Sequence, residues 1–196
     1  SQFSLGKEGE VTVYVPDTLE GTVTIKNGSG DMEIDSLAVS KLTLDNSSGY
    51  IEMNNVTADV VEIASSSGDV KLSDGKIDDF QISTSSGYVT WKNTESEHIS
   101  ITAKSGEVNV SGLGDQTNAE VSTSSGDIGI SYETPPQNLS FKISSGSDDV
   151  SVRLEDASYT METSACKQGK IGDGTYSLTV NSDSGTVESI SELLQY

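Results

Sequence analysis

A Ser-Gly dipeptide recurs along this chain at almost constant spacing. Six glycines in such dipeptides are separated by four intervals of 19 residues and then one of 20. They are Gly30, Gly49, Gly68, Gly87, Gly106 and Gly126. Internal periods of about 20 to 50 residues are typical of solenoids, in which each repeat forms one coil that stacks on the coil before it. The spacing therefore predicts a stack of short coils.

Apolar residues keep a constant register relative to these glycines. The positions seven and five before each glycine, and two and four after it, are apolar in all six repeats, although only 33% of the chain is hydrophobic. Around Gly68 these positions hold Val61, Ile63, Val70 and Leu72. A spacing of two places alternate side chains on one face of a strand. Because strands that follow one another from coil to coil run parallel, we predict an all-β, single-domain, β-helix-like parallel β-solenoid.

The residues between these pairs suggest the shape of a coil. A weaker apolar pair lies seven and nine residues after the first glycines, as at Leu37 and Val39. It favours three short strands per coil. The Ser-Ser-Gly corner is expected to be the tightest, because glycine tolerates positive φ. The corner serines are expected to form a hydroxyl ladder that satisfies backbone groups.

Counting the corners predicts about ten coils of 19–20 residues within one domain, 1–196. Residues 1–20 would hold an N-terminal cap and a first partial coil at Gly9, residues 21–187 the regular coils, and residues 188–196 a C-terminal cap. A cap is expected because an uncovered edge promotes aggregation. In this count Asp148 and Cys166 replace glycine at two corners, Cys166 as a small buried side chain, and Gly185 forms the last corner.

Composition excludes several classes of function. The chain has 31 acidic and 11 basic residues, a formal net charge of −20, which argues against nucleic-acid binding. One histidine and one cysteine exclude a structural zinc cluster and an intrachain disulfide framework. The chain has no apolar run of 18 residues, so we expect no membrane span within it. An anchor removed from this chain would be compatible with that expectation.

The repeated motif resembles a known bacterial family. Segments 123–130 and 83–91 both read Thr/Ser-Ser-Ser-Gly-Asp/Tyr followed by alternating apolar residues. This pattern is similar to a family of β-strand repeats labelled as adhesins, a domain of unknown function. The resemblance covers about residues 9–190 and implies a right-handed, β-helix-like solenoid. It also implies a bacterial extracellular or cell-envelope location, and it brings no catalytic residues.

The residue after each glycine is the candidate binding site. We expect these six side chains to stack as one exposed strip, with tyrosine rings as platforms for a surface glycan or a protein partner. The strip comprises Asp31, Tyr50, Asp69, Tyr88, Glu107 and Asp127. A purely structural interpretation is also open, because aspartate favours turns and tyrosine suits the start of a strand.

The acidic residues do not suggest a metal or catalytic site. Carboxylates on adjacent coils, such as Glu33 with Glu52 or Glu107 with Asp127, could approach one calcium ion, but the Gly-Gly-x-Gly-x-Asp calcium repeat is absent. Glu107 and Asp127 could also form a retaining glycosidase pair, yet a convex corner offers no cleft. His98 is expected in a solvated loop. We predict no metal, no cofactor and no catalytic residue.

These observations favour a non-catalytic bacterial surface or envelope module, an adhesin or a scaffold that presents a repetitive acidic and aromatic face. Two alternatives stay open. One is a carbohydrate-active or carbohydrate-binding β-helix domain. The other is an envelope-stress or signalling module that binds a partner protein.

Overall fold

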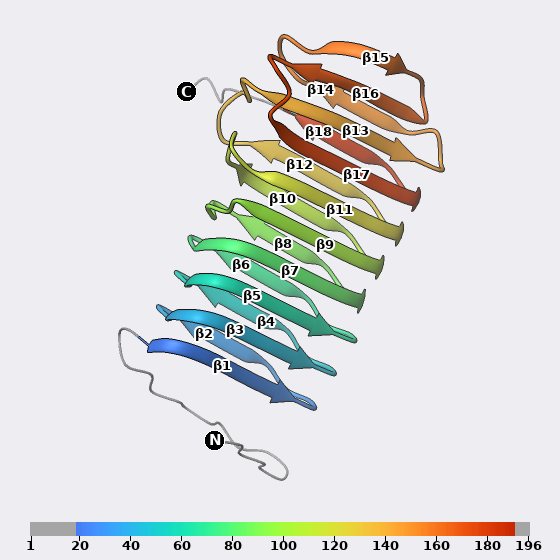
Figure 1. The fold of residues 1–196 in the computed structure, drawn as a ribbon. Helices are drawn as coiled ribbons and strands as arrows, with labels where there is room; N and C mark the ends of the chain where they lie inside the picture. The colour runs from blue at the N-terminus through green and yellow to red at the C-terminus, as the bar shows by residue number, and fades with distance from the viewer. Residues whose placement is uncertain (1–18, 191–196) are drawn as a thin grey trace, which may run out of the picture.

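The computed structural model describes residues 19–190 as two β-sheets that run side by side along an elongated molecule (Figure 1). One sheet has ten strands, most of them long, and is called here the long-strand sheet. The other has eight strands of four to six residues, and is called the short-strand sheet. Within residues 19–190 there is no helix that is long and apolar enough to cross a membrane.

Residues 19–132 form six coils that stack in sequence order, each with one long and one short strand. The long strands are β1 (Leu19–Asn27), β3 (Ala38–Asn46), β5 (Thr57–Ser65), β7 (Lys76–Ser86), β9 (His98–Ser105) and β11 (Asn118–Ser125). The short strands are β2 (Met32–Asp35), β4 (Ile51–Asn54), β6 (Val70–Ser73), β8 (Val89–Lys92), β10 (Val108–Leu113) and β12 (Ile128–Tyr132). Every pair of neighbours in these coils is parallel. The predicted parallel β-solenoid is confirmed.

The expectation of three strands per coil is wrong. Leu37 and Val39 are buried, as their apolar character requires, but Val39 lies inside β3 and Leu37 immediately before it. The pairing between β3 and β5 is interrupted once, between Val39 and Lys41. The third apolar pair therefore belongs to the start of the long strand, and each coil has two strands.

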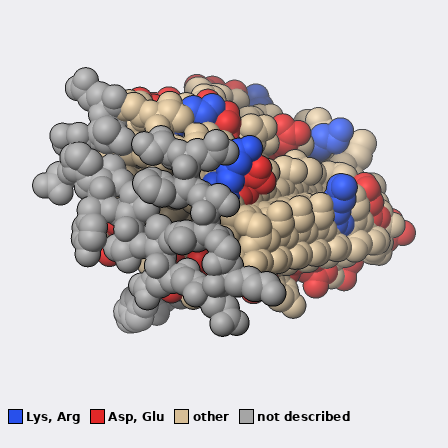
Figure 2. All heavy atoms as spheres, turned by 90° about the horizontal axis from the view of Figure 1, so that it is seen from below, with Lys and Arg blue, Asp and Glu red and all other residues tan. Residues whose placement is uncertain are grey.

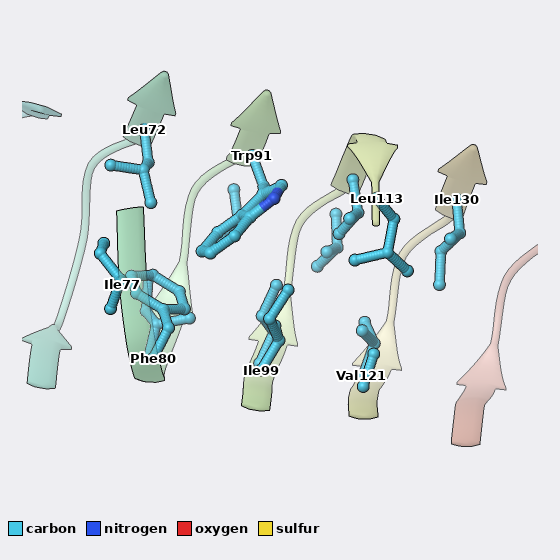
Figure 3. Close-up of a cluster of buried hydrophobic side chains, with 14 of the residues drawn as sticks. Leu72, Ile77, Phe80, Trp91, Ile99, Leu113, Val121 and Ile130 are labelled. Carbon is cyan, nitrogen blue, oxygen red and sulfur yellow. The ribbon is translucent and has the colours of Figure 1, made fainter. Parts of the chain in front are cut away.

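The core is one continuous stack of the predicted inward pairs. Nearly all are buried, and Val23, Ile25 and Ile34 near the N-terminal end are partly buried. Trp91 lies in its expected inward position between Leu72 and Val110 on the neighbouring strands. Its ring meets that of Phe80 edge to face, with centroids 4.8 Å apart (Figure 3). Few hydrophobic residues suffice because every coil shares this narrow core.

The Ser-Ser-Gly corner requires glycine for two reasons. The backbone at Gly49 has φ +101°, and a Cβ atom there would lie 2.1 Å from the carbonyl oxygen of Gly30 on the coil before. The serine before the glycine donates a hydrogen bond down the stack, from Ser67 to the Ser47 carbonyl at 3.2 Å and from Ser105 to the Ser85 carbonyl at 3.1 Å. The predicted hydroxyl ladder is confirmed.

A second corner, which is not among the sequence-based expectations, follows β2, β4, β6 and β8. The residues there have left-handed backbone conformations, with φ between 45° and 54°. They are Ser36, Asn55, Asp74 and Asn93, and the next residue of this column is Gly112. Asparagine, aspartate and glycine adopt this conformation most readily, so the column was readable six residues after each corner glycine.

Beyond β12 the strands no longer stack in sequence order. The remaining strands are β13 (Leu139–Ser145), β14 (Val150–Arg153), β15 (Ser158–Glu162), β16 (Cys166–Ile171), β17 (Tyr176–Ser184) and β18 (Val187–Ile190). The last two pair with β11 and β12, and the coil of β13 and β14 packs on their far side. The coil formed last in the sequence therefore lies inside the stack.

This order corrects the predicted count of about ten sequential coils. Asp148 does occupy a corner position, with φ 57°, and Gly185 stacks directly on Gly126. The corner predicted at Cys166 is wrong. Cys166 is half-buried at the start of β16, which is antiparallel to both β13 and β15.

The two ends of the predicted domain lie partly outside the described residues. The first partial coil at Gly9 falls in residues 1–18, which the structure does not describe. The predicted cap at 188–196 begins within β18, and residues 191–196 are not described. At the C-terminal end, the hairpin of β15 and β16 extends the long-strand sheet (Figure 1).

Candidate functional site

The six strip residues lie in one row along the first corner, each on its own coil. The amide of the residue after each member donates to the carbonyl of the member on the next coil, as from Met32 to Tyr50 and from Ile51 to Asp69, both at 2.9 Å. All six side chains are exposed. Because the last coil is inserted, Thr186 and then Asp149 continue the row after Asp127. Sequence order could not place these two.

The strip aspartates hold the backbone of the following coil. Oδ1 of Asp31 accepts a hydrogen bond from the Tyr50 amide at 3.0 Å, and Oδ1 of Asp69 accepts one from the Tyr88 amide at 2.9 Å. Asp127 accepts from the Thr186 amide at 2.7 Å. These three carboxylates therefore have a structural function, which supports the structural interpretation for the aspartates.

The two strip tyrosines present aromatic surface to solvent. The exposed fraction is 38% for Tyr50 and 57% for Tyr88. They lie two coils apart, roughly 9.6 Å at the usual strand spacing, with Asp69 between them. The Tyr50 hydroxyl donates to Oε1 of Glu33 at 2.9 Å. This hydrogen bond and the charge of Glu33 are the main causes that raise the pKa of Tyr50.

The row beside the strip, on the outer face of the short-strand sheet, is charged. Nζ of Lys71 lies 2.7 Å from Oε1 of Glu52, and this ion pair lowers the pKa of Glu52. Glu33 and Glu52, considered as a calcium pair, therefore have different partners, since Glu33 binds Tyr50. Across residues 19–190 the structure contains no group of three His, Cys, Asp or Glu side chains that could hold a metal ion.

Glu107 and Asp127 lie on the convex corner, on adjacent coils. Both side chains are exposed, and one carboxylate oxygen of Asp127 is already engaged by the Thr186 amide. Neither residue lines the groove around Ile99 and Ala119 or the larger groove around His98. Glycoside hydrolysis needs an acid and a base shielded from water, and this part of the surface offers no such shielding.

The larger groove lies around the single histidine, at the second corner. It has a volume of about 600 Å³ and is lined by Lys76, Glu95, Glu97, His98 and Asp115, among others. The prediction of a loop position for His98 is wrong, because His98 is the first residue of β9 and pairs with Asp79 and Asn118. The prediction that it is exposed is confirmed. His98 lies eight residues before Gly106, a position that faces outward in the other coils. The register of the repeat could therefore have predicted an outward position in a strand for His98.

Acidic side chains are spread over the molecule and do not converge on one site. Figure 2, which views the molecule from below, shows Asp and Glu at several separate places on the face in view, with Lys or Arg next to some of them. Several lysines pair with an acidic side chain one coil away, as in Lys26 with Asp45 and Lys41 with Glu62. The charge therefore covers the outward faces of the coils.

Comparison with known protein families identifies a match to the family described as Toastrack DUF4097, over residues 1–189. This chain belongs to the Toastrack family. The Toastrack domain is a β-solenoid of unknown function, which agrees with the fold described above. The predicted assignment to a domain of unknown function is confirmed, but nothing in the match supports the adhesin label. Neither the curated proteins nor the solved structures gave a match.

Proposed function

We propose that this Toastrack solenoid is a non-catalytic bacterial surface or envelope module, an adhesin or scaffold that binds its partner through the strip. The observation that carries the proposal is the pair of exposed tyrosines, Tyr50 and Tyr88, in a row whose backbone is fixed by Asp31 and Asp69. Exposed aromatic rings with a polar end are common at binding surfaces. The partner that we favour is an extended surface glycan.

The geometry supports recognition by a prepared surface. The amides of both tyrosines are held by carboxylates of the coil before, and the Tyr50 hydroxyl is held by Glu33. A side chain that is already ordered loses less entropy when it binds. Two rings in the same row, separated by one coil, also suit a ligand that itself repeats along its length.

The non-catalytic part of the proposal rests on the hydrogen bonds that the strip carboxylates already make. Asp31, Asp69 and Asp127 each accept a backbone hydrogen bond, so these groups are committed to the fold. Glu107 stands on the same convex corner. If polysaccharide turnover were detected and disappeared in Glu107→Gln, the carbohydrate-active alternative would replace this proposal.

A glycan array tests the proposed face. We would compare the wild-type chain with the double variant Tyr50→Ala/Tyr88→Ala, and with Gln81→Ala/Thr43→Ala on the long-strand sheet as the matched control. Loss of two aromatic contacts is expected to weaken binding at least tenfold, since such contacts commonly contribute more than about 1 kcal/mol each. The control should bind like wild type.

Two results would contradict the proposal. One is equal glycan binding by the wild type and the tyrosine variant. The other is no glycan binding by any of the three proteins, which would favour the partner-protein alternative. Circular dichroism of the wild type and both variants is expected to show that the fold is retained, because the substituted side chains lie outside the core.

A further inference from the structure

The coil of β17 and β18 occupies a slot between two coils that precede it in the sequence. On one side it pairs with β11 and β12, and on the other with β13 and β14, all in parallel register. The slot is the space between those two coils (Figure 1). Its occupant is the C-terminal part of the described chain, which connects to the rest only through residues 172–175.

The inserted coil is matched to the slot on both sides. Leu178 and Val180 are completely buried, and they pair with Ala119 and Val121 of β11 on one side. On the other side they pair with Phe141 and Ile143 of β13. The inserted coil thus completes the core between its neighbours.

Polar contacts at the first corner add specificity. The hydroxyls of Thr123 and Ser182 lie 3.1 Å apart in the interior, and Ser184 donates to the Ser124 carbonyl at 3.3 Å. The Thr186 amide donates to Asp127 at 2.7 Å. Residues 176–190 of any copy of this chain would make the same contacts, because none of these contacts involves the connecting loop.

The connecting loop has the properties of a hinge. Residues 172–175 carry the chain from β16 past the start of β13, because β16 and β17 lie on opposite sides of β13. Gly172 and Gly174 have φ of 57° and 78°, and a Cβ atom on Gly172 would lie 2.3 Å from the Gln137 carbonyl oxygen. Gly172, Asp173 and Thr175 are exposed. Short, conformationally demanding loops at the surface promote domain swapping.

We propose that the slot also accepts the β17–β18 coil of a second copy, which gives a domain-swapped dimer. Each copy then supplies residues 176–190 to the other. The exchanged coil fills each slot and makes there the same contacts as in the monomer. The exchange takes place during folding, because Leu178, Val180 and Val187 are fully buried once the coil has inserted. The partner is therefore another molecule of this chain, selected by register and by the corner hydrogen bonds.

Mixed refolding of two single-cysteine variants tests the exchange. Both carry Cys166→Ser, and one carries Glu120→Cys, the other Thr179→Cys. These two exposed positions are paired between β11 and β17, and paired parallel residues lie roughly 4.8 Å apart, within the range that a disulfide can bridge. After denaturation, mixing at high protein concentration, refolding and oxidation, we expect a covalent heterodimer.

A second mixture is the matched control. Ser100→Cys and Glu120→Cys, also with Cys166→Ser, are paired in the same way between β9 and β11, which are not exchanged. This mixture should give little heterodimer. If the 120–179 mixture gives no more heterodimer than the 100–120 mixture, the proposal is wrong.

Loop length gives a second, independent measurement. Deletion of Asp173 and Gly174 leaves too little chain to pass β13 within one molecule, so the refolded protein should become predominantly dimeric in light scattering. In the chain with the intact loop, insertion of four glycine and serine residues after Gly174 should instead favour the monomer. A dimer fraction that does not change with loop length would also overturn the proposal.

Discussion

Stacked carbonyl groups leave no space for a side chain at the Ser-Ser-Gly corner. A Cβ atom on Gly68, which has φ +110°, would lie 2.0 Å from the carbonyl oxygen of Gly49. We expect Gly68→Ala to lower the free energy of unfolding by about 3 kcal/mol, measured by urea denaturation, because strain and a backbone clash act together. Gly129→Ala is the control. A Cβ atom there meets nothing within 4 Å, so its stability should change by less than about 1 kcal/mol. Equal losses in both variants would contradict this explanation.

The contact between Tyr50 and Glu33 has a consequence at alkaline pH. The hydrogen bond to Glu33 and its negative charge raise the pKa of Tyr50 above its ordinary value of 10.0. The contribution to stability is therefore complete below about pH 10 and is lost as the pH rises through the higher folded-state pKa. The absorbance difference between wild type and Tyr50→Phe should show that the Tyr50 phenol loses its proton at a higher pH than an ordinary tyrosine. Glu33→Gln should shift it to lower pH, and an unchanged titration would contradict the assignment.

At the scale of strands, the inserted coil should be as stable as the coils around it. β17 forms hydrogen bonds on both sides, whereas β15 pairs on one side only, with β16. Amide hydrogens of central strands exchange more slowly than those of edge strands. We expect residues 178–182 to be protected in hydrogen exchange as strongly as residues 119–123, and residues 158–162 much less. Fast exchange of residues 178–182 would show that the last coil is not inserted in solution.

The same strands show how far the sequence could predict the fold. The inward pairs were predictable because alternate burial in a strand demands a period of two. The order of the last coils was not, since Phe141 with Ile143 and Leu178 with Val180 fit equally well against β11. Cys166 was misplaced because Thr163-Ser164-Ala165-Cys166 resembles a corner of the solenoid. In the structure the Thr163 hydroxyl accepts a hydrogen bond from the Cys166 amide at 2.9 Å, and this bond closes a hairpin turn.

The candidate strip was predictable as an exposed row, but its internal roles were not. Register alone placed six residues after six glycines on one edge. It could not distinguish Asp69, which holds the Tyr88 amide of the next coil, from Glu107. That difference depends on the length and direction of each side chain relative to a neighbour 19 residues away. The inserted coil then added Thr186 and Asp149 to the row, which only the stacking order reveals.

For the whole molecule, the formal charge of −20 opposes the compact stack. Ion pairs between adjacent coils, such as Lys26 with Asp45, offset only part of this, because both side chains are more than half exposed and such pairs contribute little. Repulsion between outward carboxylates should therefore dominate the dependence of stability on salt. It should also oppose non-specific association of molecules at neutral pH, where the protein is far from its isoelectric point near 4.1.

Raising the salt concentration should stabilise the solenoid. Between about 0.01 M and 0.15 M salt the screening length falls from about 30 Å to about 8 Å, so we expect sodium chloride to raise the free energy of unfolding by about 1 kcal/mol, or Tm by about 2–4 °C. Choline chloride is the control and should act equally, because the effect is screening.

Calcium chloride at matched ionic strength separates screening from binding. A shift in Tm that exceeds the sodium value and saturates at low calcium concentration would reveal a specific site, since a bound ion stabilises by mass action. With Glu33 bound to Tyr50, Glu52 to Lys71 and Asp127 to the Thr186 amide, we expect no such excess.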